Sequence, residues 1–188
     1  MASSYDRIIK ATIELMNKKG YHGTSIQMIA DKAKISKSTI IHHFNNKEGI
    51  LLAILGKHVP DAGKRLKEIV DNNGMKGRDK LKLFMQSHLG QIDNYGDIMN
   101  LNLRETRYFS SKNKKIYKEI QHEYEDLLRK IVLQIQKEEK HLLHGLDPKI
   151  ITLALLGMLN SIPQWYKKKG KLGIDEIADQ IYRMVTFT

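Results

Sequence analysis

The chain has 188 residues and a formal net charge of +11, from 32 Lys and Arg against 21 Asp and Glu. Its 41% hydrophobic and 28% charged residues are typical of a folded protein, and its length allows one domain and a small second one. The absence of cysteine excludes disulfide scaffolds, thiolate zinc sites and cysteine nucleophiles, and the excess positive charge favours a polyanionic partner.

Apolar residues recur at helical spacing along nearly the whole chain, and no stretch alternates apolar and polar residues as a strand does. The fold class is therefore predicted to be all-α. The longest nearly apolar stretch, residues 150–159, is shorter than the roughly 20 residues that a membrane-spanning helix needs. The first ten residues lack the apolar core of a signal peptide. We expect a cytoplasmic protein without a membrane partner.

The N-terminal region predicts three short helices in succession. The first begins after Ser3, which can form a capping box with Asp6, and it ends at Gly20. The second is predicted to begin at Thr24, where Gln27 completes a second capping box.

A tight turn at residues 34–35 separates the second helix from a third one. The third helix is predicted to begin at Ser36 and to end near Phe44. A fourth helix is predicted to follow, with Asn45 as its cap and Glu48 in its first turn. Two short helices joined by so tight a turn form a helix-turn-helix, whose second helix enters a major groove.

Pro60 and the turn at residues 72–74 are predicted to break the helical pattern. A domain boundary is placed within residues 55–61, giving a DNA-binding domain of residues 1–57 and a helical bundle of residues 58–188. The first 57 residues carry a net charge of +5, from nine basic and four acidic residues, so positive charge is denser there. The bundle helices are predicted at residues 78–94, 97–107, 112–140, 147–170 and 174–185.

The face of the third helix that points away from its apolar side carries short hydroxyls, imidazole rings and one cation. All of these groups can donate hydrogen bonds to phosphates or base edges. No acidic residue occurs between Asp31 and Glu48, so this helix meets no like-charge repulsion from a phosphate backbone. His42 and His43 point about 100° apart on a helix, which disfavours a shared metal ion, and no metal site is predicted.

The segment GTSIQMIADKAKISKSTIIHHFNNKEGILLAIL (residues 23–55) resembles the DNA-binding domain of TetR-family transcriptional regulators. The pattern matches at Thr24, Ile29-Ala30, Ser36, Thr39, His43-Phe44 and Lys47-Glu48. The resemblance implies a homodimer that binds a palindromic double-stranded DNA operator, usually as a repressor released by a small ligand. Two positions depart from the pattern: Lys34 stands where glycine is usual, and Ile41 stands where a phosphate-contacting tyrosine is usual. The predicted DNA-binding residues are Thr24, Ser25, Ser36, Lys37, Ser38, Thr39, His42, His43 and Lys47.

Residues 101–109 and 156–181 are similar to a FadR/KstR-like branch of this family that controls fatty-acid and sterol catabolism. Its Asn-x-x-x-x-Trp-Tyr-x-x-x-Gly pattern appears at Asn160, Trp165, Tyr166 and Gly170. The resemblance implies an acyl-CoA effector and no required cofactor. An acyl tail needs an apolar tunnel between helices, and the CoA phosphates need cations, for which residues 167–169 are further candidates. The predicted effector-binding residues are Met99, Leu103, Arg104, Arg107, Tyr108, Phe109, Tyr124, Leu127, Leu128 and Trp165.

The last two predicted helices also carry apolar residues at the spacing of a buried face. Such a face would be an exposed patch on a monomer, so these helices are expected to pair with their two-fold mates in a homodimer. The predicted interface residues are Ile151, Ala154, Leu155, Met158, Ile177, Ile181 and Met184.

The sequence also bears on two other functions. An enzyme is not expected, because the chain has no phosphate-binding glycine loop and no HExxH motif. A multidrug-responsive repressor of an efflux system is the alternative on the same fold. Its pocket for cationic drugs would need buried acids among aromatic rings, for which Glu105 and Glu123 are the candidates.

Overall fold

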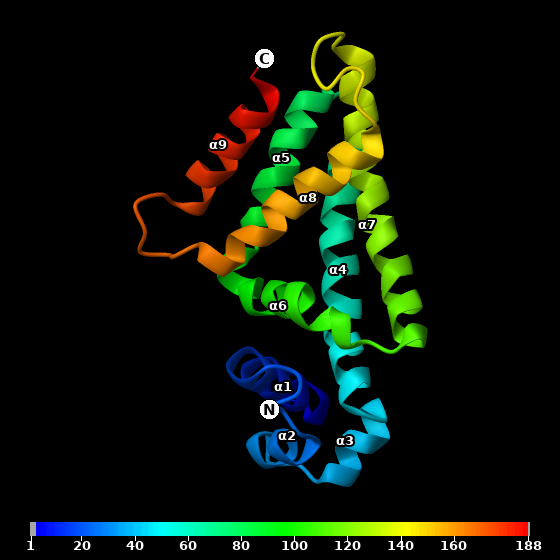
Figure 1. Cartoon of the computed structure of the whole chain (residues 1–188), viewed down its shortest axis with the longest axis vertical. Coiled ribbons are helices and arrows are strands. Elements are labelled where there is room, and N and C mark those ends of the chain that lie inside the picture. The colour runs from blue at the N-terminus through cyan, green and yellow to red at the C-terminus, as the bar shows by residue number, and fades with distance from the viewer. Residues whose placement is uncertain (1–2, 188) are drawn as a thin grey trace. The chain divides into compact units, whose positions relative to one another are not determined.

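The computed structural model describes residues 3–187, and this range forms nine α-helices and one 3-10 turn without a strand (Figure 1). The predicted all-α fold class is confirmed. No helix in the range is long and apolar enough to cross a membrane. The elements are α1 (Ser4–Lys19), α2 (Ile26–Ala33), α3 (Lys37–Phe44), α4 (Lys47–Asp71), α5 (Gly77–Leu89), α6 (Ile92–Glu105), η1 (Thr106–Tyr108), α7 (Ser111–Glu138), α8 (Pro148–Trp165) and α9 (Ile174–Thr186).

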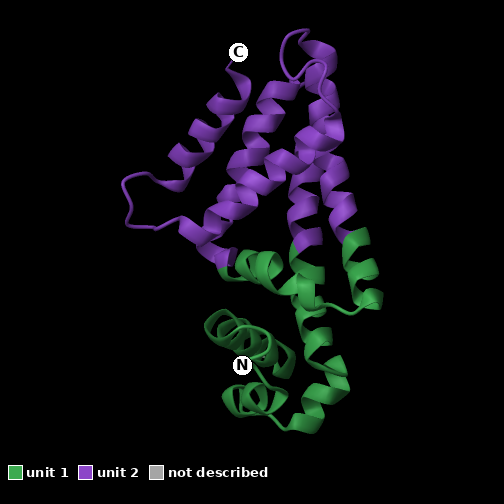
Figure 2. Ribbon diagram, in the orientation of Figure 1, with its two compact units in different colours: residues 1–58, 97–119 green, residues 59–96, 120–188 purple. Residues whose placement is uncertain are grey.

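The helices group into two compact units (Figure 2). Unit 1 comprises residues 1–58 and 97–119, and unit 2 comprises residues 59–96 and 120–188. Helices α4, α6 and α7 contribute to both units. The predicted domain boundary after residue 57 falls inside α4 and stays a prediction, whereas the helix-turn-helix lies wholly in unit 1.

Both ends of α1 are fixed by residues next to it in the sequence, as predicted. The Asp6 N–H donates to Ser3 Oγ at 3.1 Å, and the Ser3 N–H donates to Asp6 Oδ2 at 3.2 Å, which completes a capping box. Gly20 ends the helix with φ of 72°, a conformation that glycine adopts without steric cost.

Two of the predicted caps are wrong by one residue. Helix α2 is capped by Ser25 instead of Thr24, because the Ser25 hydroxyl accepts the Met28 N–H at 3.1 Å. Helix α4 begins after Asn46 instead of Asn45. Asn45 closes α3 with φ of 65°, a positive value that asparagine tolerates better than most residues, and it therefore cannot hold the extended backbone of an N-cap.

The turn between α2 and α3 is made by Lys34 in the left-handed conformation, with φ of 54° and ψ of 51°. This conformation costs a residue with a Cβ atom about 1–2 kcal/mol, which explains why glycine is usual here. The Arg7 guanidinium on α1 donates to the carbonyl oxygens of Ala33 at 3.2 Å and Lys34 at 3.4 Å. These contacts stabilise the turn that sets the position of α3.

The predicted helix break at Pro60 is wrong, because α4 continues through this residue to Asp71. Proline inside a helix removes one hydrogen bond and costs about 3 kcal/mol. Buried Ile54 and Leu55 precede Pro60 and buried Leu66 follows it. Burial of each large apolar side chain stabilises by about 1.5–3 kcal/mol, so packing on both sides outweighs the cost.

The predicted helix of residues 78–94 is wrong at its end, since α5 ends at Leu89 and α6 begins at Ile92. The Gly90 N–H donates to Gln86 O at 2.8 Å. A Cβ atom at Gly90 would lie only 2.9 Å from this carbonyl oxygen, so the close approach requires glycine.

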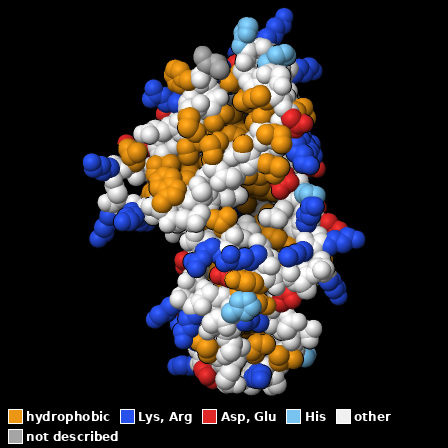
Figure 3. Space-filling view, viewed as in Figure 1, with side chains coloured by type: hydrophobic (Ala, Val, Ile, Leu, Met, Phe, Trp, Pro, Cys, Tyr) orange, Lys and Arg blue, Asp and Glu red, His pale blue; other side chains and the backbone are white. Residues whose placement is uncertain are grey.

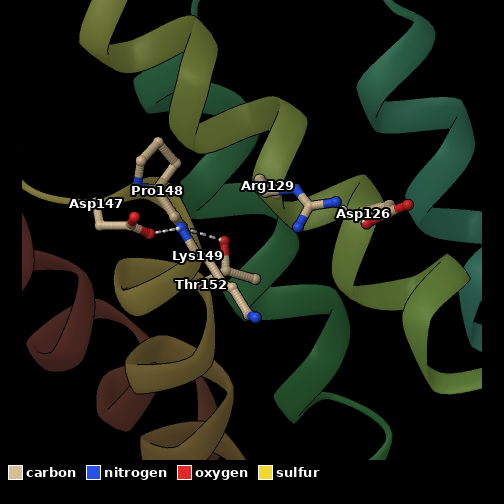
Figure 4. A network of polar contacts seen from close by, with 6 residues as sticks. All are labelled: Asp126, Arg129, Asp147, Pro148, Lys149 and Thr152. Carbon is tan, nitrogen blue, oxygen red and sulfur yellow. Dashed lines mark hydrogen bonds and ion pairs between the residues drawn. The ribbon is translucent and has the colours of Figure 1, made fainter. Parts of the chain in front are cut away.

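The start of α8 agrees with the prediction, and its end does not. Asp147 Oδ1 accepts the N–H groups of Lys149 at 2.7 Å and Ile150 at 3.1 Å, and Pro148 occupies the first helical position (Figure 4). The helix ends at Trp165, five residues before the predicted end at Gly170. The lysine-rich segment that follows is therefore a loop.

Candidate DNA-binding and effector sites

Helix α3 presents its polar side chains to solvent and its apolar ones to the core of unit 1. Ile40 and Phe44 are buried, and the Phe44 ring lies 5.1 Å from the Tyr5 ring of α1. The exposed residues include Ile41, which offers no phosphate hydrogen bond. Of the predicted DNA-binding residues, Lys37, Ser38, His42 and His43 are exposed, and Thr39 is half-buried.

The hydroxyl groups at the helix N-termini have structural partners of their own. Thr24 is 1% exposed, and its Oγ1 donates to Gly20 O at 2.9 Å. Ser25 is exposed beside it and caps α2. Ser36 Oγ accepts the Thr39 N–H at 3.1 Å and caps α3. Contacts of these residues with DNA stay predictions, and Ser25 is the more accessible hydroxyl at the α2 terminus.

The ammonium group of Lys47 contacts the turn between α1 and α2. Its ammonium donates to Tyr21 O and, at 2.7 Å, to Thr24 O, and it lies 4.1 Å from the centre of the Tyr21 ring. Burial lowers the pKa of this ammonium, and the nearby Glu105 carboxylate opposes part of the change. Two of the three ammonium donors are thus used inside unit 1, and a phosphate contact of Lys47 stays a prediction.

Lys47→Met is expected to destabilise the protein by about 1–3 kcal/mol, because two carbonyl oxygens lose their donor. Urea unfolding followed by circular dichroism measures the change. Lys57→Met, at an exposed position of the same helix, is the matched control and is expected to stay within about 0.5 kcal/mol of the parent. Equal stability of the two variants would show that the carbonyl contacts of Lys47 contribute nothing.

A buried carboxylate and an aromatic stack join the α1–α2 turn to the end of α6. Glu105 is buried and accepts the Tyr21 N–H at 3.2 Å. The Tyr21 and Tyr108 rings stack 5.5 Å apart, and the His22 ring meets Tyr108 edge-on at 4.5 Å. The sequence did not predict this cluster, because Tyr21 and His22 lie more than 80 residues before Glu105 and Tyr108.

Glu48 makes a second connection within unit 1. Its Oε1 accepts the Ser110 N–H at 2.6 Å and the Ser110 hydroxyl at 2.8 Å. Burial raises the pKa of the Glu48 carboxyl, but hydrogen bonds from Ser110 and Asn113 outweigh burial and lower it. Lys47 and Glu48, the Lys-Glu pair of the motif, therefore tie the start of α4 to two different segments.

The predicted effector-binding residues divide between the two units. Those from Met99 to Phe109 lie in unit 1, and Tyr124, Leu127, Leu128 and Trp165 lie in unit 2. Leu103, Arg104, Arg107 and Trp165 are exposed, whereas Met99, Phe109 and Leu128 are buried. Lys168, in the lysine-rich loop, pairs with Asp93 at 3.0 Å. A shared effector cavity stays a prediction.

A polar group that the sequence did not single out lies inside unit 2. His88 Nδ1 and Tyr124 OH are 2.8 Å apart, and both rings pack near Phe84. Burial raises the pKa of the Tyr124 phenol, and the positive charge of Arg65 opposes part of the rise. Tyr124 was predicted as an effector-binding residue, and in the structure its hydroxyl lies within hydrogen-bonding distance of His88.

Helices α8 and α9 of unit 2 present apolar side chains to solvent. The predicted interface residues Ile151, Leu155 and Ile177 are buried within the single chain, whereas Ala154 and Met184 are exposed and Met158 and Ile181 are half-buried. Ile150 and Leu153 were not predicted and are exposed. Figure 3 shows hydrophobic side chains gathered over this unit. The dimer interface itself stays a prediction.

Within residues 3–187 no group of three or more His, Cys, Asp or Glu side chains is placed to hold a metal ion. The His42 and His43 rings lie 5.6 Å apart at nearly right angles. The site is thus a helix-turn-helix whose second helix exposes hydroxyls, imidazoles and a lysine, which defines a DNA-binding transcriptional regulator.

Family models bear this out over both parts of the chain. Residues 8–54 match the model of bacterial regulatory proteins of the tetR family, and residues 74–187 match the tetracyclin repressor-like C-terminal domain. The chain therefore belongs to the TetR family of bacterial regulatory proteins.

One relative, the uncharacterized HTH-type transcriptional regulator YvkB of Bacillus subtilis, is 32% identical over 114 residues. That alignment covers 58% of this chain and 56% of the relative, so the chain spans little more than half of its length.

Two solved structures share the fold over nearly the whole chain. AibR in complex with isovaleryl coenzyme A and operator DNA has a TM-score of 0.85 at 24% identity and covers 98% of both chains. FadR from Bacillus subtilis in complex with stearoyl-CoA has a TM-score of 0.80 at 22% identity, with 97% of this chain and 98% of that chain covered.

Proposed function

We propose that the protein is a homodimeric, cytoplasmic repressor that binds a palindromic operator and is released by an acyl-CoA thioester. The observation that carries the DNA-binding part is the exposed polar face of α3, which includes Lys37 and no carboxylate. A two-fold dimer would present two such helices about 34–36 Å apart, the separation of successive major grooves on one side of DNA.

The exposed stripe of α8 supports the dimer. Ile150, Leu153, Ala154 and Gly157 recur at intervals of three and four residues and are all exposed. A Cβ atom at Gly157 would meet nothing within 4 Å, so this position leaves room for a second helix to approach closely. On α9, Met184 is 64% exposed. A stripe of this kind is typical of a surface that a partner covers.

The acyl-CoA part is supported by the sequence pattern around Asn160 and Trp165, and by the two acyl-CoA-bound structures of the same fold. The multidrug alternative finds less support. Glu105 is engaged by the Tyr21 N–H, and Glu123 is exposed, so neither candidate acid is a free buried carboxylate.

Acyl-CoA is expected to raise the melting temperature, because it binds the folded protein. It is also expected to weaken operator binding at least about tenfold, because a ligand that stabilises the conformation that does not bind DNA must lower the affinity for DNA. Differential scanning fluorimetry measures the first effect. Fluorescence anisotropy on an operator fragment selected with the parent protein measures the second. Chain lengths from isovaleryl-CoA to stearoyl-CoA are compared, with free CoA as the control. Absence of any thermal shift with every chain length would remove acyl-CoA as the effector.

A further inference from the structure

Hydrogen bonds to backbone atoms fix the turn between α2 and α3. The Ile35 N–H donates to Ala30 O at 3.1 Å. The Lys34 N–H donates to Asp31 O at 3.3 Å, which completes the Schellman pattern of a helix C-terminus. The Arg7 guanidinium donates to Lys34 O at 3.4 Å. These contacts reach only the backbone of position 34, so they impose its φ of 54° and ψ of 51° whichever residue stands there.

Lysine is poorly suited to this conformation. In the left-handed region its Cβ atom crowds the following carbonyl oxygen, and glycine adopts the same backbone without that steric cost. No ion pair of the side chain offsets the cost, because Lys34 is exposed and is absent from the ion pairs within residues 3–187. Lys32, two residues earlier, pairs with Glu14 at 2.6 Å. A strained residue whose side chain is left to solvent indicates a role outside the chain.

The position of Lys34 in the helix-turn-helix defines what it can reach. In this motif the first helix crosses the phosphate backbone, and the N-terminal residues of the second helix contact base edges. Lys34 ends α2 and lies three residues before Lys37, the first residue of α3. Consecutive Cα atoms are 3.8 Å apart, so the Cα atoms of the two lysines are separated by at most about 11 Å. From Lys34 to Lys47 the sequence contains no acid that would repel a phosphate.

We propose that Lys34 binds a phosphate of the DNA backbone in each half-site of the operator. This proposal rests on the proposed function, because it adds a contact to the surface that binds DNA. The lysine ammonium acts on a phosphate as a point charge, and its contribution comes from the counterions that the phosphate releases. The contact positions the protein on the duplex and carries no base specificity. The turn thus trades stability for DNA affinity, because the residue that fits its backbone best has no charge.

Lys34→Gly separates the charge from the turn. Since glycine fits the left-handed backbone better than lysine, the variant is expected to melt about 1–4 °C above the parent in differential scanning fluorimetry. Its affinity for the operator fragment selected with the parent protein is expected to fall about 10–50-fold in fluorescence anisotropy. The slope of the logarithm of the binding constant against the logarithm of salt concentration is expected to fall by about 2, one phosphate for each half-site. Higher stability together with weaker binding cannot result from a damaged turn.

Three further variants complete the test on the full-length protein. Lys34→Arg keeps the cation and is expected to stay within about threefold of the parental affinity. Lys34→Asn removes the charge and also tolerates the left-handed conformation, so it is expected to repeat the loss and keeps the test valid if glycine loosens the turn. Lys32→Gln is the control, because it removes a paired charge two residues away and is expected to change the affinity less than about twofold.

The proposal is overturned if either Lys34→Gly or Lys34→Asn binds the operator at parental affinity, or if Lys34→Arg loses as much affinity as they do. An unchanged salt slope in Lys34→Gly would also overturn it, because a lost phosphate contact must release fewer counterions. In each of these cases the parent still binds DNA and the proposed function stands. A parent protein that binds no double-stranded DNA at low salt would remove both.

Discussion

Replacing Lys37 and Thr39 together by alanine will lower the affinity for operator DNA at least about 100-fold and leave the fold intact. Each side chain on the exposed face of α3 that contacts DNA contributes about 1–3 kcal/mol, and a dimer loses every contact twice. The fold is expected to survive because Ser36 Oγ accepts the backbone N–H of Thr39 at 3.1 Å, and alanine keeps this N–H although it loses the 2.7 Å contact between the Ser36 and Thr39 hydroxyls. Lys37 is exposed and is absent from the ion pairs within residues 3–187.

Fluorescence anisotropy across a range of salt concentrations measures this loss. If Lys37 binds one phosphate in each half-site, the slope of the logarithm of the binding constant against the logarithm of salt concentration will fall by about 2. Lys19→Ala, which removes one exposed charge from α1, is the control and is expected to change affinity only slightly. Operator binding by the double variant at parental affinity would show that α3 is not the recognition helix.

The sequence alone predicted helix ends correctly where those ends are determined by residues within one or two helical turns. Helix ends are fixed in this way at Ser3, Gly20 and Asp147, each of which contacts a residue no more than four positions away. Such local patterns can be recognised in the sequence. Pro60 shows the limit of this reasoning. Local chemistry predicts a break there, but the buried residues on either side of it hold α4 together, and burial is a property of the whole fold.

The candidate sites show the same limit. The exposed face of α3 could be predicted, because residues two apart on a helix point in nearly opposite directions, which separates Ser38 and His42 from Ile40. The partners of Lys47 could not, since Tyr21 and Thr24 lie more than 20 residues away and are bound through backbone oxygens, which carry no sequence signal. Arg65 likewise looks like any other basic residue of an amphipathic helix until the fold buries its Nε–H.

Leu153→Asp is expected to raise the dimer dissociation constant at least about 100-fold, because a two-fold interface would bury the new carboxylate twice without a partner. Leu153 is 43% exposed in the single chain, so its replacement leaves unit 2 folded. The monomeric variant is also expected to lose operator affinity, because each subunit then binds a single half-site without its partner. Sedimentation velocity measures the oligomeric state, and circular dichroism reports the fold.

Two further variants separate dimer loss from unfolding. Leu155 was predicted to lie in the dimer interface, but it is 2% exposed within unit 2, so Leu155→Asp is expected to unfold the protein. Leu133 of α7 is 49% exposed and lies outside the α8 stripe, so Leu133→Asp is expected to remain a folded dimer. The stripe would be ruled out as the interface if Leu153→Asp sedimented as a dimer. Dissociation of the Leu133→Asp dimer would instead place the interface on α7. An introduced aspartate weakens the dimer only where the partner subunit excludes water from its carboxylate.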